Sequence, residues 1–342
     1  MTTKKILILK NDRGGDLFTS LRLISSLNIK NNKIRLYLSE LNNGFAFLFK
    51  NIEIIKIKYD LKISNRINIF LDIIKNKYDE IYILSPKTFY FFLPFIFRKI
   101  KFFAIVYNGK KRNRPNNFLR KFLFSYKVIS RIKKKKNNYE ELQTKLLDDN
   151  IELDNNFTNL SIPLISSELK SILPKSFLFF QFRYLFFEDL KWNFDDLDKL
   201  FSALLTKYEN ILFSSDIENN SKSIKYINYF KKKYSSIDTN NYKINLNNNS
   251  KKIFFLENLG AKNLFLILKE SQINLGKHGI ISHISHFHSA KCHNLFNFEI
   301  NNIYDFYHQK FSYSEWYSHM SYKFSFLNND INKTIRKILK FI

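Results

Sequence analysis

An acidic residue that could act as a base stands near the start of the chain, directly after two glycines. A strand-like run, KILILK, ends at Lys10, and Gly14, Gly15 and Asp16 then lead into a helical pattern. Glycine permits positive φ and a close approach of backbone amides to a ligand, and a helix N-terminus attracts anions. A carboxylate at a strand end, facing a cleft, is where a general base would sit. The alternative interpretation of Asp16 is an N-terminal helix cap.

Cationic residues in the second half of the chain could bind a phosphate group. Arg183 follows the strand-like run SFLFFQF, and Lys191 with Trp192 precedes an acidic helix start, FDDLDKL. A flexible lysine ammonium can stabilise the charge that builds on a departing diphosphate. The alternatives are a solvent-exposed Lys191 and a packing role for Trp192 between helix and sheet.

The strongest local signal lies in residues 264–296, LFLILKESQINLGKHGIISHISHFHSAKCHNLF. This segment predicts an apolar helix, a short strand, a loop with Lys277, His278 and Gly279, and a second helix that bears His283. A lysine beside a helix N-terminus forms a credible anion site. The loop therefore predicts phosphate binding.

Two groups of residues could suggest a metal site. Asp196 and Asp198 superficially match a metal-holding pair of carboxylates, but they lie inside a helical pattern, which favours a solvated helix face. His283, His286 and His288 are closely spaced, yet no carboxylate or thiol completes a recognisable zinc pattern. We predict neither a metal nor another cofactor.

The elements that must position these residues alternate between strands and helices. Such alternation predicts a parallel sheet covered by helices on both faces, with ligands at the carboxyl ends of the strands. The pattern fades around 151–175, where two prolines indicate a linker, and then restarts. We predict two facing Rossmann-like α/β domains, residues 1–160 and 161–342, with an amphipathic helix over 330–342. The predicted strands are 5–10, 33–38, 52–58, 80–84, 101–107, 176–182, 210–215, 252–256 and 273–276. The predicted helices are 16–28, 66–77, 88–98, 116–150 with a break at Lys133–Lys136, 194–208, 221–234 and 261–270.

Composition limits the class of protein. A chain of 342 residues with 45% hydrophobic and 17% aromatic residues suits two domains and excludes wholesale disorder. The 56 basic and 30 acidic residues give a net charge of +26, which implies an anionic partner: nucleic acid, a phospholipid surface or a phosphorylated substrate. A single cysteine, Cys292, rules out an internal disulfide, and with no signal peptide it predicts a cytoplasmic location.

Two segments raise the question of a membrane surface. The run Phe89–Phe97, FYFFLPFIF, is followed by basic residues and is too short to span a bilayer. It predicts either a core helix or an aromatic and basic edge that rests on a membrane. The run Lys133–Lys136 indicates a solvated face, with a contact to a phosphorylated acceptor or lipid headgroups as the alternative.

The motifs in this order resemble the heptosyltransferases of glycosyltransferase family 9 over nearly the whole chain. In that family a strand leads to a loop ending in Gly-Asp and then to a helix, as ILILK, Gly15-Asp16 and LFTSLRLISSL do here. The family also has a Lys-Trp pair before a second-domain helix, similar to Lys191-Trp192. Its diphosphate-binding loop, followed by a histidine, is similar to the segment with Gly279 and His283.

The resemblance implies roles for several residues. It implies that Asp16 deprotonates the acceptor hydroxyl and that Lys191 meets the donor's phosphates. It also implies an acidic residue near the nucleoside, a place that Asp216 or Glu218 could fill. Where the family has an acidic residue before the glycine loop, this chain has Lys277 and His278.

The resemblance implies an inverting, metal-independent glycosyltransferase with a fold of the glycosyltransferase B type. The resemblance implies a nucleotide-diphosphate sugar donor, with ADP-heptose the first guess, and an anionic glycolipid acceptor such as a lipopolysaccharide core. The charge would help the protein meet such an acceptor at the inner membrane surface. Two alternatives are a nucleic-acid-binding protein that uses basic and aromatic residues, and a degenerate relative that only binds glycan.

Overall fold

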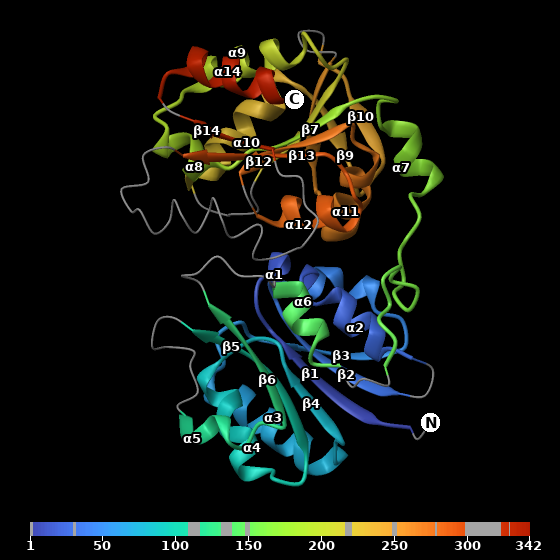
Figure 1. Ribbon diagram of the computed structural model, residues 1–342. Helices are drawn as coiled ribbons and strands as arrows, with labels where there is room; N and C mark the ends of the chain where they lie inside the picture. Colours follow the sequence, from blue (N-terminus) through green and yellow to red (C-terminus); the bar gives the residue numbers. More distant parts are fainter. Residues whose placement is uncertain are drawn as a thin grey trace. The chain divides into compact units, whose positions relative to one another are not determined.

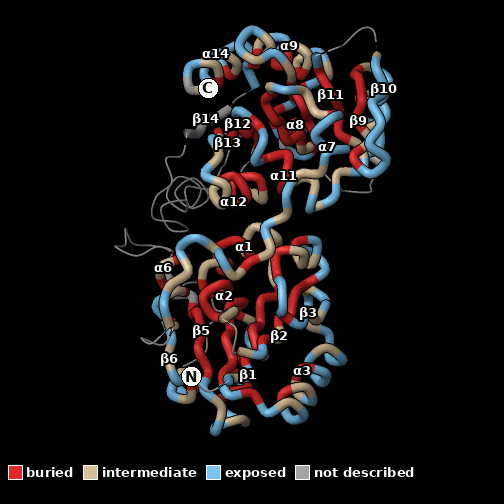
Figure 2. The backbone as a smooth tube through the Cα atoms, turned by 90° about the vertical axis from the view of Figure 1, so that its right-hand side faces the viewer, coloured by how far each residue is buried: buried red, intermediate tan, exposed pale blue. Residues whose placement is uncertain are grey.

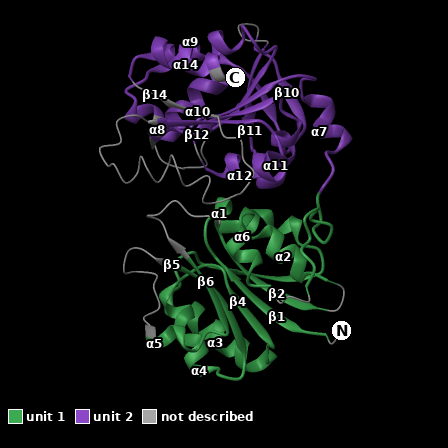
Figure 3. Cartoon of the chain, in the orientation of Figure 1, with its two compact units in different colours: residues 1–162, 310–320 green, residues 163–309, 321–342 purple. Residues whose placement is uncertain are grey.

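The computed structural model describes residues 3–29, 32–108, 117–130, 139–147, 151–215, 221–247, 252–277, 279–297, 323–327 and 329–342. The described residues divide into two compact units, coloured separately in Figure 3. Unit 1 holds those up to Ile162, and unit 2 holds those from Pro163 onward. Each unit is an α/β structure with its own sheet and its own hydrophobic core.

Unit 1 contains a sheet of six parallel strands in the order β3-β2-β1-β4-β5-β6 (Figure 1). The central strand β1 pairs with β2 on one side and β4 on the other, so the strand order reverses direction there. In an open sheet of this kind the reversal point is where ligands bind, beyond the carboxyl ends of the strands. The strands are β1 (Lys5–Lys10), β2 (Lys33–Ser39), β3 (Ile52–Ile57), β4 (Glu80–Ile83), β5 (Lys101–Asn108) and β6 (Ser125–Ser130).

Helices cover both faces of this sheet (Figure 1). One face carries α1 (Gly14–Phe18), α2 (Leu21–Leu27) and α6 (Tyr139–Thr144), and the other carries α3 (Ile63–Asn76), η2 (Thr88–Phe92), α4 (Leu93–Ile96) and α5 (Asn117–Arg120). A short 3-10 helix, η1 (Asn43–Leu48), follows β2. Because both faces are covered, β1 is an unbroken apolar run from Ile6 to Leu9, fully buried (Figure 2).

Unit 2 contains an eight-stranded sheet in the order β10-β9-β11-β8-β7-β12-β13-β14, parallel except for the β9–β10 pair. Its reversal point is β7, which lies between β8 and β12. The strands are β7 (Leu178–Gln181), β8 (Ile211–Ser214), β9 (Ser235–Asp238), β10 (Lys243–Asn245), β11 (Ile253–Glu257), β12 (Ile273–Lys277), β13 (Cys292–Asn297) and β14 (Lys323–Leu327). The helices are α7 (Ser167–Ile172), α8 (Tyr184–Asp189), α9 (Phe194–Leu204), α10 (Ser221–Lys233), α11 (Ala261–Glu270), α12 (Ile280–Phe287) and α14 (Ile331–Phe341).

Phenylalanine rings fill the core of unit 2. Phe213 packs edge-on against Phe230 with ring centroids 5.0 Å apart, and Phe230 packs against Phe182 at 4.9 Å. Phe182 also stacks on Phe187 at 4.7 Å, which ties the end of β7 to α8. Aromatic pairs contribute about 0.5–1.5 kcal/mol each beyond their buried area. This packing fixes the carboxyl end of β7, where Arg183 follows.

The structure corrects several predicted elements. The segment 116–150 is not one broken helix, because β6 lies within it and pairs in parallel with β5. The sequence SYKVIS of β6 is rich in residues that favour strands, and pairing with a sheet edge decides the outcome. The predicted helix 16–28 is two helices separated at Thr19-Ser20, and 88–98 begins as a 3-10 helix. The strands β9, β10, β13 and β14 were not predicted, nor were the helices α7 and α8. The run Lys133–Lys136 lies outside the described residues.

Candidate functional site

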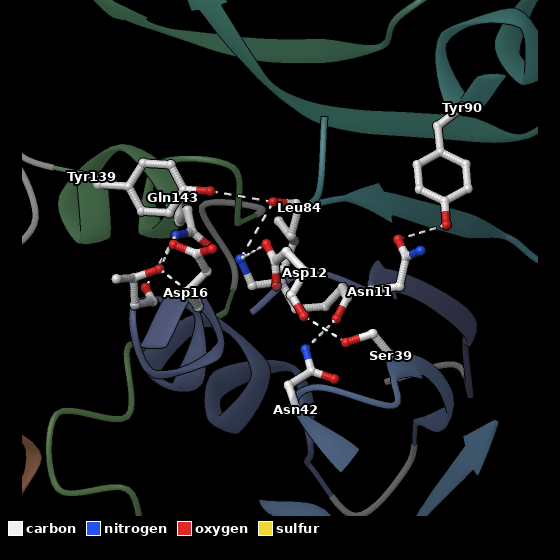
Figure 4. Close-up of polar contacts among 11 residues, drawn as sticks. Asn11, Asp12, Asp16, Ser39, Asn42, Leu84, Tyr90, Tyr139 and Gln143 are labelled. Carbon is white, nitrogen blue, oxygen red and sulfur yellow. Dashed lines mark hydrogen bonds and ion pairs between the residues drawn. The ribbon is translucent and has the colours of Figure 1, made fainter. Parts of the chain in front are cut away.

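A buried ion pair stands at the carboxyl end of β1. Lys10, the last residue of the strand, is fully buried, and its Nζ lies 2.7 Å from Asp12 Oδ2 and 3.5 Å from the carbonyl oxygen of Leu84 (Figure 4). A buried ammonium is tolerated only when a carboxylate and further acceptors replace its water. The other carboxylate oxygen of Asp12, Oδ1, is buried and accepts no hydrogen bond within the described part of the chain. The loop after β1 therefore begins with a buried pair of opposite charges, Lys10 and Asp12.

Neighbouring elements hold this loop by direct hydrogen bonds (Figure 4). The Asn42 amide donates to the carbonyl of Lys10 at 2.8 Å, and the Ser39 hydroxyl donates to the carbonyl of Asp12 at 2.5 Å. On the other side, the hydroxyl of buried Tyr90 donates to Asn11 Oδ1 at 2.8 Å. The residues after β1 are thus fixed from β2, η1 and η2, which is the preorganisation that a catalytic loop requires.

Asp16 is the third residue of α1, so the alternative prediction that it caps this helix is wrong. The cap position belongs to Arg13, and the Asp16 carboxylate accepts a hydrogen bond from the Arg13 backbone amide. Gly14 and Gly15 are helical, and no glycine of the described residues has a positive φ, which corrects the loop conformation expected there. The turn is held further by the Thr19 hydroxyl, which donates to the carbonyl of Asp16 at 2.7 Å.

The surroundings of Asp16 raise its pKa to about 6 from the usual 3.8. Burial contributes most, because desolvation disfavours the ionised form, and the nearby Asp12 carboxylate raises the pKa further. Lys10 and the Arg13 amide act in the opposite direction, since each stabilises the anion. A carboxylate with this pKa is ionised at neutral pH and still basic enough to accept a proton from a reacting hydroxyl group.

In unit 2 the structure brings together two of the predicted phosphate-binding residues. Arg183 follows β7, and Gly279 is the N-cap residue of α12, the helix that follows the neighbouring strand β12. A side-chain carbon added at Gly279 would lie 2.7 Å from Arg183 Nη2, so the guanidinium lies against the bare backbone of this glycine. Lys277, half-buried, ends β12 at the same edge of the sheet. Arg183 and the N-terminus of α12 therefore lie together at the reversal point of this sheet, where Lys277 also ends its strand, and this arrangement suits a phosphate group.

The start of α12 is anchored to the sheet behind it. The Ser282 hydroxyl donates to Asn294 Oδ1 at 2.5 Å, linking α12 to β13. The Asn274 amide donates to Ser285 Oγ at 2.9 Å and links the same helix to β12. His283, predicted to follow the phosphate loop, lies on α12 and is buried. Its role in donor binding stays a prediction.

Lys191 is separated in sequence from Arg183, which lies at the carboxyl end of β7, by helix α8. It follows α8, whose six residues span about 9 Å, and its side chain is exposed. Its backbone adopts a left-handed conformation, with φ 56°, and the next residue, Trp192, is buried in the core against Phe187. The contact of Lys191 with a donor stays a prediction.

The residues considered for a metal have other partners. Asp196 belongs to a capping box with Asn193 at the start of α9, and Asp198 accepts hydrogen bonds from Lys233 and Tyr234. The His288 ring nitrogen Nε2 lies 3.0 Å from the carbonyl oxygen of Phe265. No cluster of three or more potential metal ligands occurs among the described residues. Asp216, Glu218 and His278 lie outside the described residues.

Sequence reasoning missed most of the polar network around Asp16. Lys10 was read as the end of a strand, although a lysine that closes a fully apolar run and precedes Asn11 and Asp12 could have signalled a buried ion pair. The contributions of Asn42 and Tyr90 come from elements distant in sequence, and no local pattern predicts them. The network therefore depends on which elements the order of strands in the sheet places beside β1.

The fold of the chain is that of the B-type glycosyltransferases, with two Rossmann-like units. Among solved structures it is similar to a family 9 glycosyl transferase from Veillonella parvula DSM 2008, with a TM-score of 0.62 at 12% identity, covering 100% of this chain and 90% of that one. It is also similar to the ADP-heptose LPS heptosyltransferase II of E. coli, with a TM-score of 0.60 at 11% identity and 98% of both chains covered. The likeness in fold to family 9 that the motifs predicted is confirmed.

A similar fold is also found in a protein named as an epimerase. The UDP-GlcNAc 2-epimerase of Methanocaldococcus jannaschii has a TM-score of 0.55 at 15% identity, with 98% of this chain and 92% of that one covered. No family model matches the sequence. A curated relative, the ribosomal operon-associated A protein of Euglena longa, is 27% identical over 223 aligned positions. The match covers 52% of this chain and 41% of that protein's length.

Proposed function

We propose that the chain is an inverting, metal-independent glycosyltransferase that uses a nucleotide-diphosphate sugar. The observation that carries the proposal is the placement of Asp16 in the first turn of α1, just after the loop that follows β1, with a pKa of about 6. Neighbouring elements hold that loop by three hydrogen bonds. The likeness in fold to heptosyltransferases supports the same reaction class. Fold alone does not choose the reaction, because one fold hosts many chemistries.

In the proposed reaction the Asp16 carboxylate removes the proton from an acceptor hydroxyl group. The acceptor oxygen attacks the anomeric carbon of the donor from the side opposite the diphosphate. The bond between that carbon and the diphosphate oxygen breaks, and the diphosphate leaves with the electron pair. Arg183, Lys277 and the amides that begin α12 stabilise the charge on the leaving group. In this proposal Lys191 adds a further cation, and Asp216 or Glu218 contacts the nucleoside.

The identity of the substrates rests on the comparison with heptosyltransferases. One similar protein is described as an ADP-heptose LPS heptosyltransferase, so ADP-heptose is the first donor to test, with an anionic glycolipid as acceptor. The name of a similar protein, a UDP-GlcNAc 2-epimerase, makes UDP-sugars the second group to test. A cytoplasmic location stays a prediction, and membrane contact is a proposal of its own, argued below.

Thermal-shift measurements with a panel of nucleotide-diphosphate sugars test donor binding. A donor added at millimolar concentration, well above its Kd, raises the melting temperature, because a ligand that binds only the folded state stabilises that state. We expect a stabilising hit that is lost in an Arg183→Gln variant and kept in a Lys243→Gln variant, which removes an exposed positive charge elsewhere in unit 2. Stabilisation by oligonucleotides, with none by any nucleotide-sugar, would instead identify a nucleic-acid-binding protein.

A further inference from the structure

Exposed apolar side chains gather on one side of unit 1. Ten of the eighteen large apolar residues that are exposed in the described chain fall between residues 63 and 126. Nine of them lie on α3, η2, α4, α5 and β6, on or beside the sheet face opposite α1, α2 and α6 (Figure 1), and the tenth, Phe124, directly precedes β6. Single exposed apolar residues are ordinary on protein surfaces, but a contiguous group marks an interaction site.

Helix α3 carries an apolar stripe that does not face the core. Ile63, Ile67, Leu71 and Ile74 are spaced by four, four and three residues, which places them on one side of the helix. They are 50–73% exposed. The core is contacted by a different side of the same helix, through buried residues that include Ile69. A helix at a protein–water boundary would have polar residues on its outer stripe.

Aromatic residues continue this surface from α3 across α4 to α5. Phe70 of α3 packs on Phe97 with ring centroids 5.1 Å apart, so the two elements are neighbours. On α4, Phe95 is 39% exposed and packs on Phe118 and Phe122 at 5.8 and 5.1 Å. These ring contacts join the exposed apolar side chains of α3, α4 and α5 into one surface.

Basic side chains lie directly over these rings. The Arg98 guanidinium is 5.3 Å from the ring centroids of both Phe95 and Phe122. Lys101 Nζ lies 4.9 Å from the ring centroid of Phe124 on the adjoining edge. Arg120 and the exposed Lys99 add further positive charge to the same side. We call this surface the apolar-basic face: the exposed apolar residues of α3, η2, α4, α5 and β6 together with these four basic residues.

The acidic residues in this part of the chain have hydrogen-bond or ion-pair partners inside unit 1. Asp72 forms an ion pair with Arg35, and Asp79 Oδ2 accepts a hydrogen bond from the backbone amide of Lys5 at 2.7 Å. Glu80 Oε1 lies 2.6 Å from Lys4 Nζ. These three are the acidic residues among residues 61–108 and 117–130. The apolar-basic face therefore combines apolar area with a positive charge that its own carboxylates do not cancel.

We propose that the apolar-basic face docks unit 1 on the surface of an anionic lipid bilayer. Aliphatic and aromatic side chains enter the boundary between headgroups and acyl chains, and the surrounding arginine and lysine side chains meet lipid phosphates. The aliphatic stripe of α3 favours a bilayer over nucleic acid, which is bound through cations and stacked aromatic rings. Within the part of the chain that the structure describes, no helix is long and apolar enough to cross a membrane.

Vesicle sedimentation tests the docking surface without any substrate. The purified chain is mixed with vesicles of phosphatidylcholine alone or with about one third phosphatidylglycerol, at physiological ionic strength. We expect binding to the anionic vesicles. An Ile67→Gln/Leu71→Gln variant is expected to bind roughly tenfold more weakly, and an Arg98→Gln/Lys99→Gln variant roughly thirtyfold more weakly, at about one kilocalorie per charge.

Matched variants in unit 2 serve as controls. Leu164→Gln/Ile224→Gln removes two exposed apolar side chains, and Lys243→Gln/Lys252→Gln removes two exposed positive charges. Both are expected to bind vesicles like the wild-type chain. The proposal is overturned if the unit 2 variants lose as much vesicle binding as the unit 1 variants, or if the α3 variant binds vesicles as well as the wild-type chain does. If the α3 variant instead changes only the mass measured by light scattering, the face is an interface between two copies and the proposal is also overturned. Because no donor is used, these results are independent of the proposed activity.

Discussion

Replacing Asp16 by Asn is expected to make the protein more stable at neutral and alkaline pH while removing its activity. The folded-state pKa of about 6 exceeds the usual value of 3.8, so the ionised carboxylate is less favourable in the folded chain than in the unfolded one. Asn has nearly the same shape, carries no charge, and keeps an oxygen that can accept the Arg13 amide hydrogen bond. The change therefore removes the unfavourable charge and little else.

The size of the effect follows from the pKa shift. A shift of about two pH units corresponds to about 3 kcal/mol, and because Asp16 is partly exposed we expect about 1–3 kcal/mol. The sign depends on pH. Above about pH 6 the carboxylate is ionised in both states and the full cost is present, whereas below the unfolded pKa of 3.8 it is protonated in both and the cost vanishes.

Urea unfolding of unit 1, followed between pH 4 and pH 8, measures this difference. We expect the Asp16→Asn variant to exceed the wild type in free energy of unfolding at pH 8, with a gain that shrinks toward zero near pH 4. Asp60→Asn removes an exposed carboxylate from the same unit and controls for the change in net charge. A variant no more stable than the wild type at pH 8, or a gain independent of pH, would refute the electrostatic reasoning.

Three further outcomes are expected. The acid limb of the profile of kcat/KM against pH has its midpoint near pH 6, and Asp12→Asn moves it to lower pH, because the neighbouring carboxylate raises the pKa of Asp16; an unmoved midpoint would show that burial acts alone. Gly279→Ala displaces the Arg183 guanidinium and raises KM for the donor with little change in melting temperature, and an unchanged KM would remove Arg183 from the phosphate site. Gly276→Ala places a carbon 2.8 Å from Ile281 and 3.0 Å from Gln181, so it destabilises unit 2 by about 1–3 kcal/mol in urea unfolding; a neutral effect would mean that the sheet edge relaxes freely.

The fold class followed from the sequence because the buried strands of both units are covered on two faces. Runs such as that of β1 are apolar at every position, which only a strand or helix buried on all sides tolerates, and helical patterns separate them. The strand β6 was missed because it lies at the edge of its sheet. Polar residues such as Ser125 and Lys127 interrupt the apolar run that would mark a buried strand. Edge strands are defined by pairing with a neighbour, which no local pattern records.

The candidate site was predictable only in part, for the same reason. Asp16 and Gly279 were found from local motifs, but the raised pKa of Asp16 results from burial and from the Asp12 carboxylate, which local motifs do not reveal. Asp12 is in turn paired with a buried Lys10 that surface statistics for lysine would place in water. The contact between Arg183 and Gly279 follows from the pairing of β7 with β12, whose residues are about 95 positions apart. Such contacts depend on the order of strands in the sheet, and the alternation of strands and helices along the sequence does not determine that order.

The central claim is that Asp16 takes the acceptor's proton during glycosyl transfer. Release of nucleoside diphosphate from ADP-heptose, measured in single turnover with a glycolipid acceptor, tests it directly in the wild type and in Asp16→Asn. We predict that the variant still binds the donor and that its rate falls by roughly 10²–10⁴-fold. An Asp16→Asn variant that releases the diphosphate as fast as the wild type would contradict the assignment.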